Sequence, residues 1–305
     1  MNNKINIHLK SVAIMQTALL ILLFVIPYSI VFAQNTIRGK SINNEVIHLW
    51  PGKVPGEDST KHPPRLYHDT SRGVVRITDI TDPVITVYAS TSKQKTNVGM
   101  IVCPGGGNKY LAVNIEGEEV AAWLNQKGIT AFVLQYRVPL KQKGALQDIQ
   151  RSLRLIRSNA AKWKLDVNKI GVIGFSAGGI LSARAGTSFK TITYPPIDAI
   201  DSLSCRPDFA LLIYPGSLAT GADHKLIPDL IVDKNTPPMF LFVANDDTIG
   251  LPLSFAYALH DAMIPMELHV YPKGGHGYGL RMGNPAAEAW PVLAEQWMKQ
   301  MFKGK

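Results

Sequence analysis

The chain has 305 residues, 46% of them hydrophobic and 18% charged, which suits one large globular domain and excludes a disordered polymer. The formal net charge is +9, but the Lys and Arg residues are scattered without a basic run, which argues against nucleic-acid binding. The two cysteines, Cys103 and Cys205, make neither a disulfide framework nor a metal-binding motif, and the sequence leaves open whether they are bridged.

The first 33 residues have the pattern of an export signal. Met1–Ala33 contains lysines, then an apolar run from Val12 to Phe32, and ends in a small residue before Gln34. This order is typical of a cleaved secretory signal peptide, although the long apolar run also fits an uncleaved membrane anchor. Because Pro27 interrupts the run near the cut, we predict cleavage. We therefore expect a secreted or periplasmic protein without stable membrane association.

Residues 34–73 and the rest of the chain have different patterns. The first are polar and rich in Pro and Gly, which predicts an extended arm with a strand at Glu45–Leu49. Residues 34–305, which include this arm, are predicted to form a single catalytic domain. Further strands are expected at Val74–Ile80 and Val84–Tyr88, as a hairpin or bent pair around Thr81–Pro83, and then at Val98–Cys103, Thr130–Leu134, Ile170–Ile173, Phe209–Tyr214, Met239–Ala244 and Met266–Tyr271.

Helical patterns alternate with these strands. They cover Glu116–Gln126, Ala145–Trp163, Gly178–Gly186, Leu253–Met263 and Ala286–Phe302. Alternation of this kind predicts the α/β class, with a mostly parallel central sheet flanked by helices on both faces. In such sheets ligands bind beyond the carboxyl ends of the strands, so site residues should follow strands directly.

A Gly-x-Ser-x-Gly pattern at Gly174–Gly178 joins a predicted strand to a predicted helix. Strand, sharp turn and helix together are the setting of a nucleophile elbow, in which the turn exposes a serine hydroxyl above the sheet. Gly174 and Gly178 are required because a Cβ at either would crowd the neighbouring strand and helix. We therefore predict Ser176 as a nucleophile and the N–H of Ala177 as an oxyanion donor.

Three glycines, Gly105–Gly107, follow the predicted strand Val98–Cys103 and its Pro104. Glycines let backbone N–H groups face a ligand without obstruction by side chains. Neither a Gly-Lys-Ser/Thr sequence nor a helix-opening Gly-x-Gly-x-x-Gly is present here, so both nucleotide-binding interpretations fail. We predict an oxyanion loop with Gly106 as the main donor, and Gly107 or Gly105 as alternatives.

A base and an acid follow late strands. His276 lies within the glycine-rich stretch Gly274–Gly279, where a core histidine would be unusual, and is predicted as the general base. Asp247 is predicted to orient its imidazole, with Asp246 as the alternative. The order Ser176, Asp247, His276 is that of α/β hydrolases, whose acyl-enzyme chemistry needs no metal or organic cofactor.

Several separated stretches resemble secreted bacterial α/β-hydrolase esterases of the acetylxylan esterase-like group, which is related to feruloyl esterases and hormone-sensitive lipases. They are Pro104–Gly107, Glu116–Gly117, Ala121–Leu124, Gly128–Arg137, Gly174–Gly179 and Pro272–Gly277. The resemblance implies an α/β-hydrolase fold and a serine carboxylesterase that removes small acyl groups, acetyl first, from plant polysaccharides or oligosaccharides. Acylated carbohydrate is then the expected partner, while the oligomeric state stays open.

The sequence departs from this group at two places near the predicted site. Ile180 follows the elbow where the group often has His, and Asn108 and Lys109 separate Tyr110 from the three glycines. We predict substrate-binding residues beside the glycine loop and the base: Asn108, Tyr110 and Tyr278. Glu116 matches an acid of the group and is expected to lie behind the site.

Other functions share parts of this pattern. A serine peptidase of the prolyl-oligopeptidase type has the same fold and order, but the chain has no room for its β-propeller. A short-chain lipase or feruloyl esterase, and an inactive carbohydrate-binding relative, are further alternatives. We expect Thr187–Arg206 and Gly216–Thr236 to form only short covers, which leaves an open site and favours small acyl groups.

Overall fold

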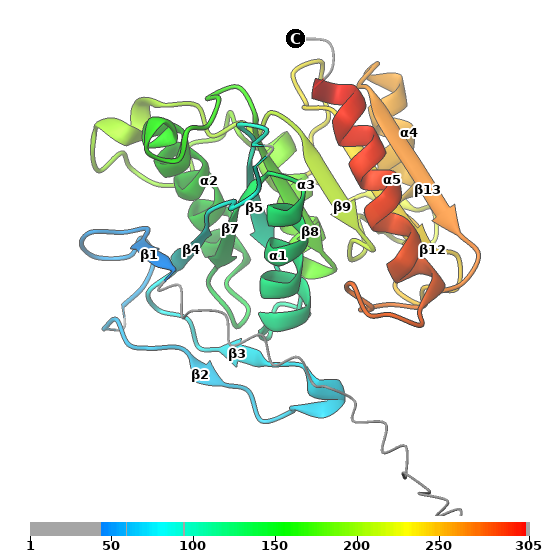
Figure 1. Cartoon of the computed structure of the whole chain (residues 1–305), viewed down its shortest axis with the longest axis horizontal. Coiled ribbons are helices and arrows are strands. Elements are labelled where there is room, and N and C mark those ends of the chain that lie inside the picture. Colours follow the sequence, from blue (N-terminus) through cyan, green and yellow to red (C-terminus); the bar gives the residue numbers. More distant parts are fainter. Residues whose placement is uncertain (1–43, 59, 94, 303–305) are drawn as a thin grey trace, which may run out of the picture. The chain divides into compact units, whose positions relative to one another are not determined.

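The computed structural model describes residues 44–58, 60–93 and 95–302, so the predicted signal peptide lies outside it. Eight strands form the central sheet in the order β1, β4, β7, β5, β8, β9, β12, β13 (Figure 1). Their bounds are β1 Glu45–His48, β4 Val84–Tyr88, β5 Gly99–Cys103, β7 Thr130–Gln135, β8 Ile170–Phe175, β9 Ala210–Ile213, β12 Met239–Ala244 and β13 Met266–Tyr271. The pairs β1–β4 and β4–β7 are antiparallel and the other neighbours are parallel, which confirms the mostly parallel sheet.

Helices cover both faces of the sheet, and each face has its own apolar core. One core contains buried residues of α1 (Glu119–Gln126) and α5 (Pro285–Phe302). The other contains residues of α2 (Gln142–Ser158), α3 (Ala177–Thr187) and α4 (Leu253–Asp261). Because successive side chains of a strand point to opposite faces, β5 supplies Met100 to the first core and Ile101 to the second. No helix in the described ranges is long and apolar enough to cross a membrane.

Both strands of the hairpin or bent pair predicted around Thr81–Pro83 form, but they do not pair with each other. β4 lies in the central sheet, whereas β3 (Arg76–Thr78) pairs with β2 (Arg65–Leu66) and β6 (Leu111–Ala112) in a separate small sheet. The chain leaves the small sheet at Asp79, with φ 57°, and the N–H of Ile80 donates to the carbonyl of Val138. Apolar alternation predicts strands but does not say which sheet each one joins.

Short helical turns complete the fold. A π-turn, η2 (Asn114–Glu118), precedes α1, and 3₁₀ turns occur at η1 (Ser71–Gly73), η3 (Ala160–Trp163) and η4 (Ala199–Ser202). The helix predicted at Ala145–Trp163 therefore begins earlier, at Gln142, and ends at Ser158 before η3. A two-stranded sheet of β10 (Ala219–Thr220) and β11 (Lys225–Leu226) lies in the segment predicted to form only a short cover.

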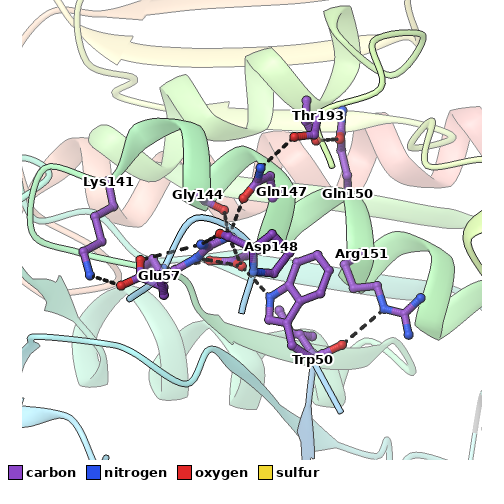
Figure 2. Close-up of polar contacts among 12 residues, drawn as sticks. Trp50, Glu57, Lys141, Gly144, Gln147, Asp148, Gln150, Arg151 and Thr193 are labelled. Carbon is purple, nitrogen blue, oxygen red and sulfur yellow. Dashed lines mark hydrogen bonds and ion pairs between the residues drawn. The ribbon is translucent and has the colours of Figure 1, made fainter. Parts of the chain in front are cut away.

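The N-terminal arm is held against α2 by a buried polar network (Figure 2). The Asp148 carboxylate, fully buried, accepts hydrogen bonds from Trp50 Nε1 at 2.9 Å, Arg137 N at 3.0 Å and Arg137 Nε at 2.9 Å. Arg137 is 1% exposed and also faces Glu57, which pairs with Lys141. This network covers the polar face of α2, which a helical pattern alone would leave in solvent.

Both cysteines are free thiols in buried positions. Cys103 ends β5, and burial raises the pKa of its thiol to about 12. The bridge that the sequence left open is therefore not formed, and Cys103 is packed as part of the core beneath the glycine loop.

Candidate active site

The turn between β8 and α3 carries Ser176 in a strained backbone conformation, with φ 51° and ψ −117°. A Cβ at Gly174 would lie 2.0 Å from the carbonyl oxygen of Gly178, and one at Gly178 would lie 2.0 Å from that of Cys103. The prediction that both positions need glycine is confirmed. The turn lifts the serine to the N-terminus of α3, directly before Ala177.

Ser176, His276 and Asp247 form one hydrogen-bonded run. Ser176 Oγ lies 2.7 Å from His276 Nε2, and His276 Nδ1 lies 2.8 Å from Asp247 Oδ2. The Asp247 side chain is fully buried, while that of His276 is 24% exposed. The Tyr214 ring packs edge-on against the imidazole with ring centroids 5.1 Å apart, which restricts its tilt.

The two neighbouring aspartates have different contacts. Asp247 Oδ1 accepts the N–H of Ile249 at 2.8 Å, which leaves its second oxygen facing the imidazole. Asp246 Oδ1 instead accepts the N–H groups of Gly274 at 2.9 Å and Gly275 at 2.8 Å, and these bonds hold the pKa of Asp246 below its usual range. Of the two acids, the structure brings Asp247 to the histidine, and Asp246 braces the loop that carries it.

The glycine loop presents two of its three residues to Ser176. The Gly105 N–H donates to Glu116 Oε2 at 2.7 Å and is not available to a ligand. Gly106, with φ 144°, and Gly107 line the cavity that contains Ser176. A Cβ at Gly106 would lie 2.0 Å from the carbonyl oxygen of Tyr110, so the close approach of the backbone there requires glycine.

Glu116 links the glycine loop to the histidine loop from below. Its Oε1 accepts from the Tyr214 hydroxyl at 2.9 Å, and that hydroxyl oxygen accepts the N–H of Gly279 at 2.9 Å. Burial raises the pKa of the Glu116 carboxyl, while the hydrogen bonds from Tyr214 and Gly105 oppose that shift. The predicted position of Glu116 behind the site fits these contacts.

A cavity of about 320 Å³ opens at Ser176 and His276. Only one of the three predicted substrate-binding residues lines it. Tyr110 lines it. Asn108 does not, and its carbonyl accepts from Leu140 instead. Tyr278 is 4% exposed and packs edge-on against Tyr214, with centroids 4.3 Å apart, so its ring belongs to the core. The substrate-binding predictions for Asn108 and Tyr278 are therefore corrected.

Several cavity residues were missed in the sequence. Arg72 and Val74 lie between β2 and β3 of the small sheet, and Arg76 lies on β3. Ile115 lies in η2, and Ile249 lies in the loop after β12. Ile249 could have been predicted from the sequence, because it lies only two positions after Asp247, the predicted orienting acid. The arginines had no such signal, because nothing in the pattern of residues 72–76 indicates that this segment lines the cavity at Ser176.

No group of three or more His, Cys, Asp or Glu side chains within the described ranges is arranged to hold a metal ion.

The chain resembles known proteins in sequence and structure. The model of the BD-FAE family matches residues 85–199. An acetylxylan esterase of Xylanibacter ruminicola is 30% identical over 203 residues, and an endo-1,4-beta-xylanase B of Butyrivibrio fibrisolvens is 33% identical over 207 residues. Each alignment covers 58% of this chain but only 40% and 32% of the respective relative, so the chain spans less than half the length of these curated relatives.

A solved structure matches over a larger share of its length. The acetyl ester-xyloside bifunctional hydrolase of Caldicellulosiruptor lactoaceticus is 34% identical, with a TM-score of 0.69, and the match covers 85% of this chain and 96% of that one. The similarity thus extends over nearly the whole of a protein of the same size class.

Proposed function

The chain belongs to the acetylxylan esterase-like α/β hydrolases, and from this premise we propose that it is a serine carboxylesterase that removes acetyl groups from carbohydrate. The observation that carries the proposal is the hydrogen-bonded run from Ser176 through His276 to Asp247, opening into a cavity beside the glycine loop. The acetylxylan esterase and esterase–hydrolase relatives support the ester-cleaving chemistry and a carbohydrate substrate.

The proposed reaction uses these groups in turn. His276 Nε2 takes the proton of Ser176 as Oγ attacks the ester carbonyl, and Asp247 stabilises the positive imidazolium. N–H groups of Ala177 and of Gly106 or Gly107 stabilise the oxyanion. As the ester C–O bond breaks, His276 donates its proton to the departing sugar oxygen, which leaves as a hydroxyl. Water activated by the same imidazole then cleaves the acyl-enzyme to release acetate.

A small acyl group is favoured by the cavity. The two segments predicted as short covers form η4, which contacts α2, and the β10–β11 hairpin, and neither lines the cavity of about 320 Å³ at Ser176. A long acyl chain needs extended apolar enclosure to gain about 0.8 kcal/mol per buried CH₂. We expect kcat/KM to fall from p-nitrophenyl acetate through butyrate and octanoate to palmitate. A maximum at octanoate or beyond would exclude an acetylesterase and favour a lipase.

One relative is a bifunctional acetyl ester and xyloside hydrolase, and another is a xylanase. Cleavage of glycosidic bonds is therefore the alternative to ester cleavage. Glycosidases generally place two carboxyl groups on either side of the scissile bond. Among the described residues, only Glu116 contributes a carboxyl to the cavity lining, and its oxygens are engaged by Gly105 and Tyr214. We expect no xylose release from p-nitrophenyl β-xyloside; release lost in Ser176→Ala would assign both activities to this cavity.

Export is a separate part of the proposal. The composition of Met1–Ala33 supports cleavage after Ala33 and a secreted or periplasmic mature chain that begins at Gln34. Mass spectrometry of protein recovered from the periplasm or medium tests this. Peptides that contain Lys4 on the exported form would favour a retained anchor.

A further inference from the structure

Two arginines line the cavity that contains Ser176, and neither has a role in the proposed ester cleavage. Arg72 lies in the turn η1 with φ 59°, in the left-handed region that non-glycine residues seldom occupy, and its side chain is exposed. Arg76 lies on β3 and is only 8% exposed. The cavity wall is therefore basic where η1 and β3 form it.

Both arginines have hydrogen-bonding capacity that the described chain does not use. The Nε of Arg76 is buried without a hydrogen-bond partner in the described part of the protein. Its Nη1 donates to the carbonyls of Asp69, Ser71 and Val74 at 2.8, 3.3 and 3.2 Å, and its Nη2 lies 3.7 Å from the Asp69 carboxylate, so Nε is the donor that stays unused. Arg72 makes no ion pair with any described residue. Buried polar groups are almost always paired, so a free donor on a residue that lines a cavity points to an acceptor supplied by a ligand.

The acids at the site do not balance this charge. Asp247 is engaged by His276 and the backbone, and it is fully buried. Glu116 is buried, and its oxygens accept from Gly105 and Tyr214 rather than from either arginine. Asp69 is the carboxylate that faces Arg76, and Arg72 has no ion pair among the described residues, so one positive charge on the side formed by η1 and β3 has no counter-charge.

We propose that Arg72 and Arg76 form a subsite for the carboxylate of an acidic sugar, a uronosyl unit next to the acylated sugar. Guanidinium groups bind carboxylates through paired, charge-assisted hydrogen bonds, more specifically than ammonium groups do. Tyr110 stands in the same wall, where the Arg76 guanidinium lies over its ring at 5.3 Å from the centroid and the Tyr67 ring packs at 4.7 Å, so these rings hold the guanidinium beside the cavity. The subsite rests on the proposed function, since it defines which acylated carbohydrate the site prefers.

Binding to the full chain carrying Ser176→Ala tests the subsite without consuming the ligand. The probes are an acetylated xylo-oligosaccharide with one glucuronosyl branch and the same oligosaccharide with that carboxyl group reduced to the alcohol. Calorimetry should give about 10-fold tighter binding of the acidic probe, the effect expected of one charge-assisted pair. The preference should shrink as sodium chloride is raised, because partly exposed charges are screened.

Two further variants in the Ser176→Ala background locate the preference. Arg72→Gln should bring the affinity ratio of the two probes close to one, and Arg72→Glu should reverse it. Arg65→Gln is the matched control, because Arg65 belongs to the same small sheet, pairs with Asp79 at 3.1 Å and does not line the cavity. It should keep the preference of the parent.

Equal affinity for the two probes, binding of neither probe, or a preference that survives Arg72→Gln would each overturn the subsite. Wild-type hydrolysis of p-nitrophenyl acetate, measured in parallel, tests the proposed function separately. A wild-type chain that cleaves this ester but has no charge preference would retain the function and lose the subsite.

Discussion

Two buried arginines, Arg137 at α2 and Arg76 at the cavity, differ in how fully their guanidinium groups are hydrogen-bonded. At α2, Arg137 is 1% exposed, and its guanidinium contacts Asp148, Glu57, Gln147 and two backbone carbonyls. At the cavity, Arg76 is nearly as buried but keeps an unpaired Nε. Removing the partner of a buried cation whose donors are all engaged destabilises the fold. A buried cation with a free donor leaves a hydrogen bond that a ligand can supply.

The buried acids of the two regions differ in the same way. Asp148 receives hydrogen bonds from Trp50 and from the backbone and side chain of Arg137. Glu116 receives one from Gly105 and one from Tyr214, and no cation contacts it directly. Substitutions at α2 should therefore cost stability, and substitutions at the cavity should cost activity or change its dependence on pH.

The largest expected effect is on activity. Ser176→Ala and His276→Ala should each reduce kcat/KM for p-nitrophenyl acetate by about 10³-fold or more, because members of such a triad act as a unit. Their thermal unfolding midpoints should stay near that of the wild type, since neither side chain contributes to either apolar core. Near wild-type turnover by Ser176→Ala would end the hydrolase mechanism as described.

The neighbouring acids provide a matched pair. Asp247→Asn should lower kcat by about 10³-fold or more, because an amide cannot hold the imidazole in the required tautomer. Asp246→Asn should cost far less, since that side chain contacts only the backbone of Gly274 and Gly275. Steady-state kinetics of the two variants decide between them, and the reverse ranking would show that Asp246 is the orienting acid.

The largest expected effect on stability is at α2. Asp148→Ala leaves the buried Arg137 without its main counter-charge and should lower the free energy of unfolding by about 3–5 kcal/mol. Asp58→Ala is the control on the same arm, because its pair with Lys53 is fully in solvent and should contribute nothing measurable. Urea unfolding measures both changes; an equal effect of the two substitutions would refute the structural role of the network.

A smaller effect is expected from Glu116. Burial raises the pKa of this carboxyl above its ordinary 4.5, so the folded chain keeps a proton that the unfolded chain has lost. The associated stabilisation is complete below pH 4.5 and is lost as pH rises through the folded pKa. The stability of the wild type minus that of Glu116→Gln should therefore fall as pH rises in urea titrations. A difference independent of pH would contradict the shift.

The parts of the site that the sequence predicted are those in which a local turn requires a particular residue. Gly174, Gly178 and Gly106 stand where a Cβ would meet a backbone carbonyl, and that requirement is visible as a short pattern. Ser176 and His276 could be identified because each follows a strand within such a pattern. In the sequence, Asp247 differed from Asp246 only in having an apolar residue, Ile249, two positions after it.

The parts that could not be predicted depend on contacts between distant segments. Trp50 and Asp148 are 98 positions apart, and nothing in the periodicity of α2 indicates that the arm buries its polar face. Arg76 reaches the cavity only because β3 leaves the predicted hairpin and joins the small sheet. Tyr278 was misassigned because Gly277 and Gly279, with φ 73° and 54°, redirect the chain and turn its ring into the core.

Acetate release from an acetylated xylo-oligosaccharide, followed by proton NMR, tests the central claim most directly. We expect the wild-type chain to release acetate and leave the glycosidic bonds intact. Ser176→Ala should release acetate at a rate that is lower by about 10³-fold or more. Undiminished release by Ser176→Ala, or a wild-type chain that leaves the acetyl groups in place while cleaving p-nitrophenyl acetate, would contradict a Ser176-dependent carbohydrate acetylesterase.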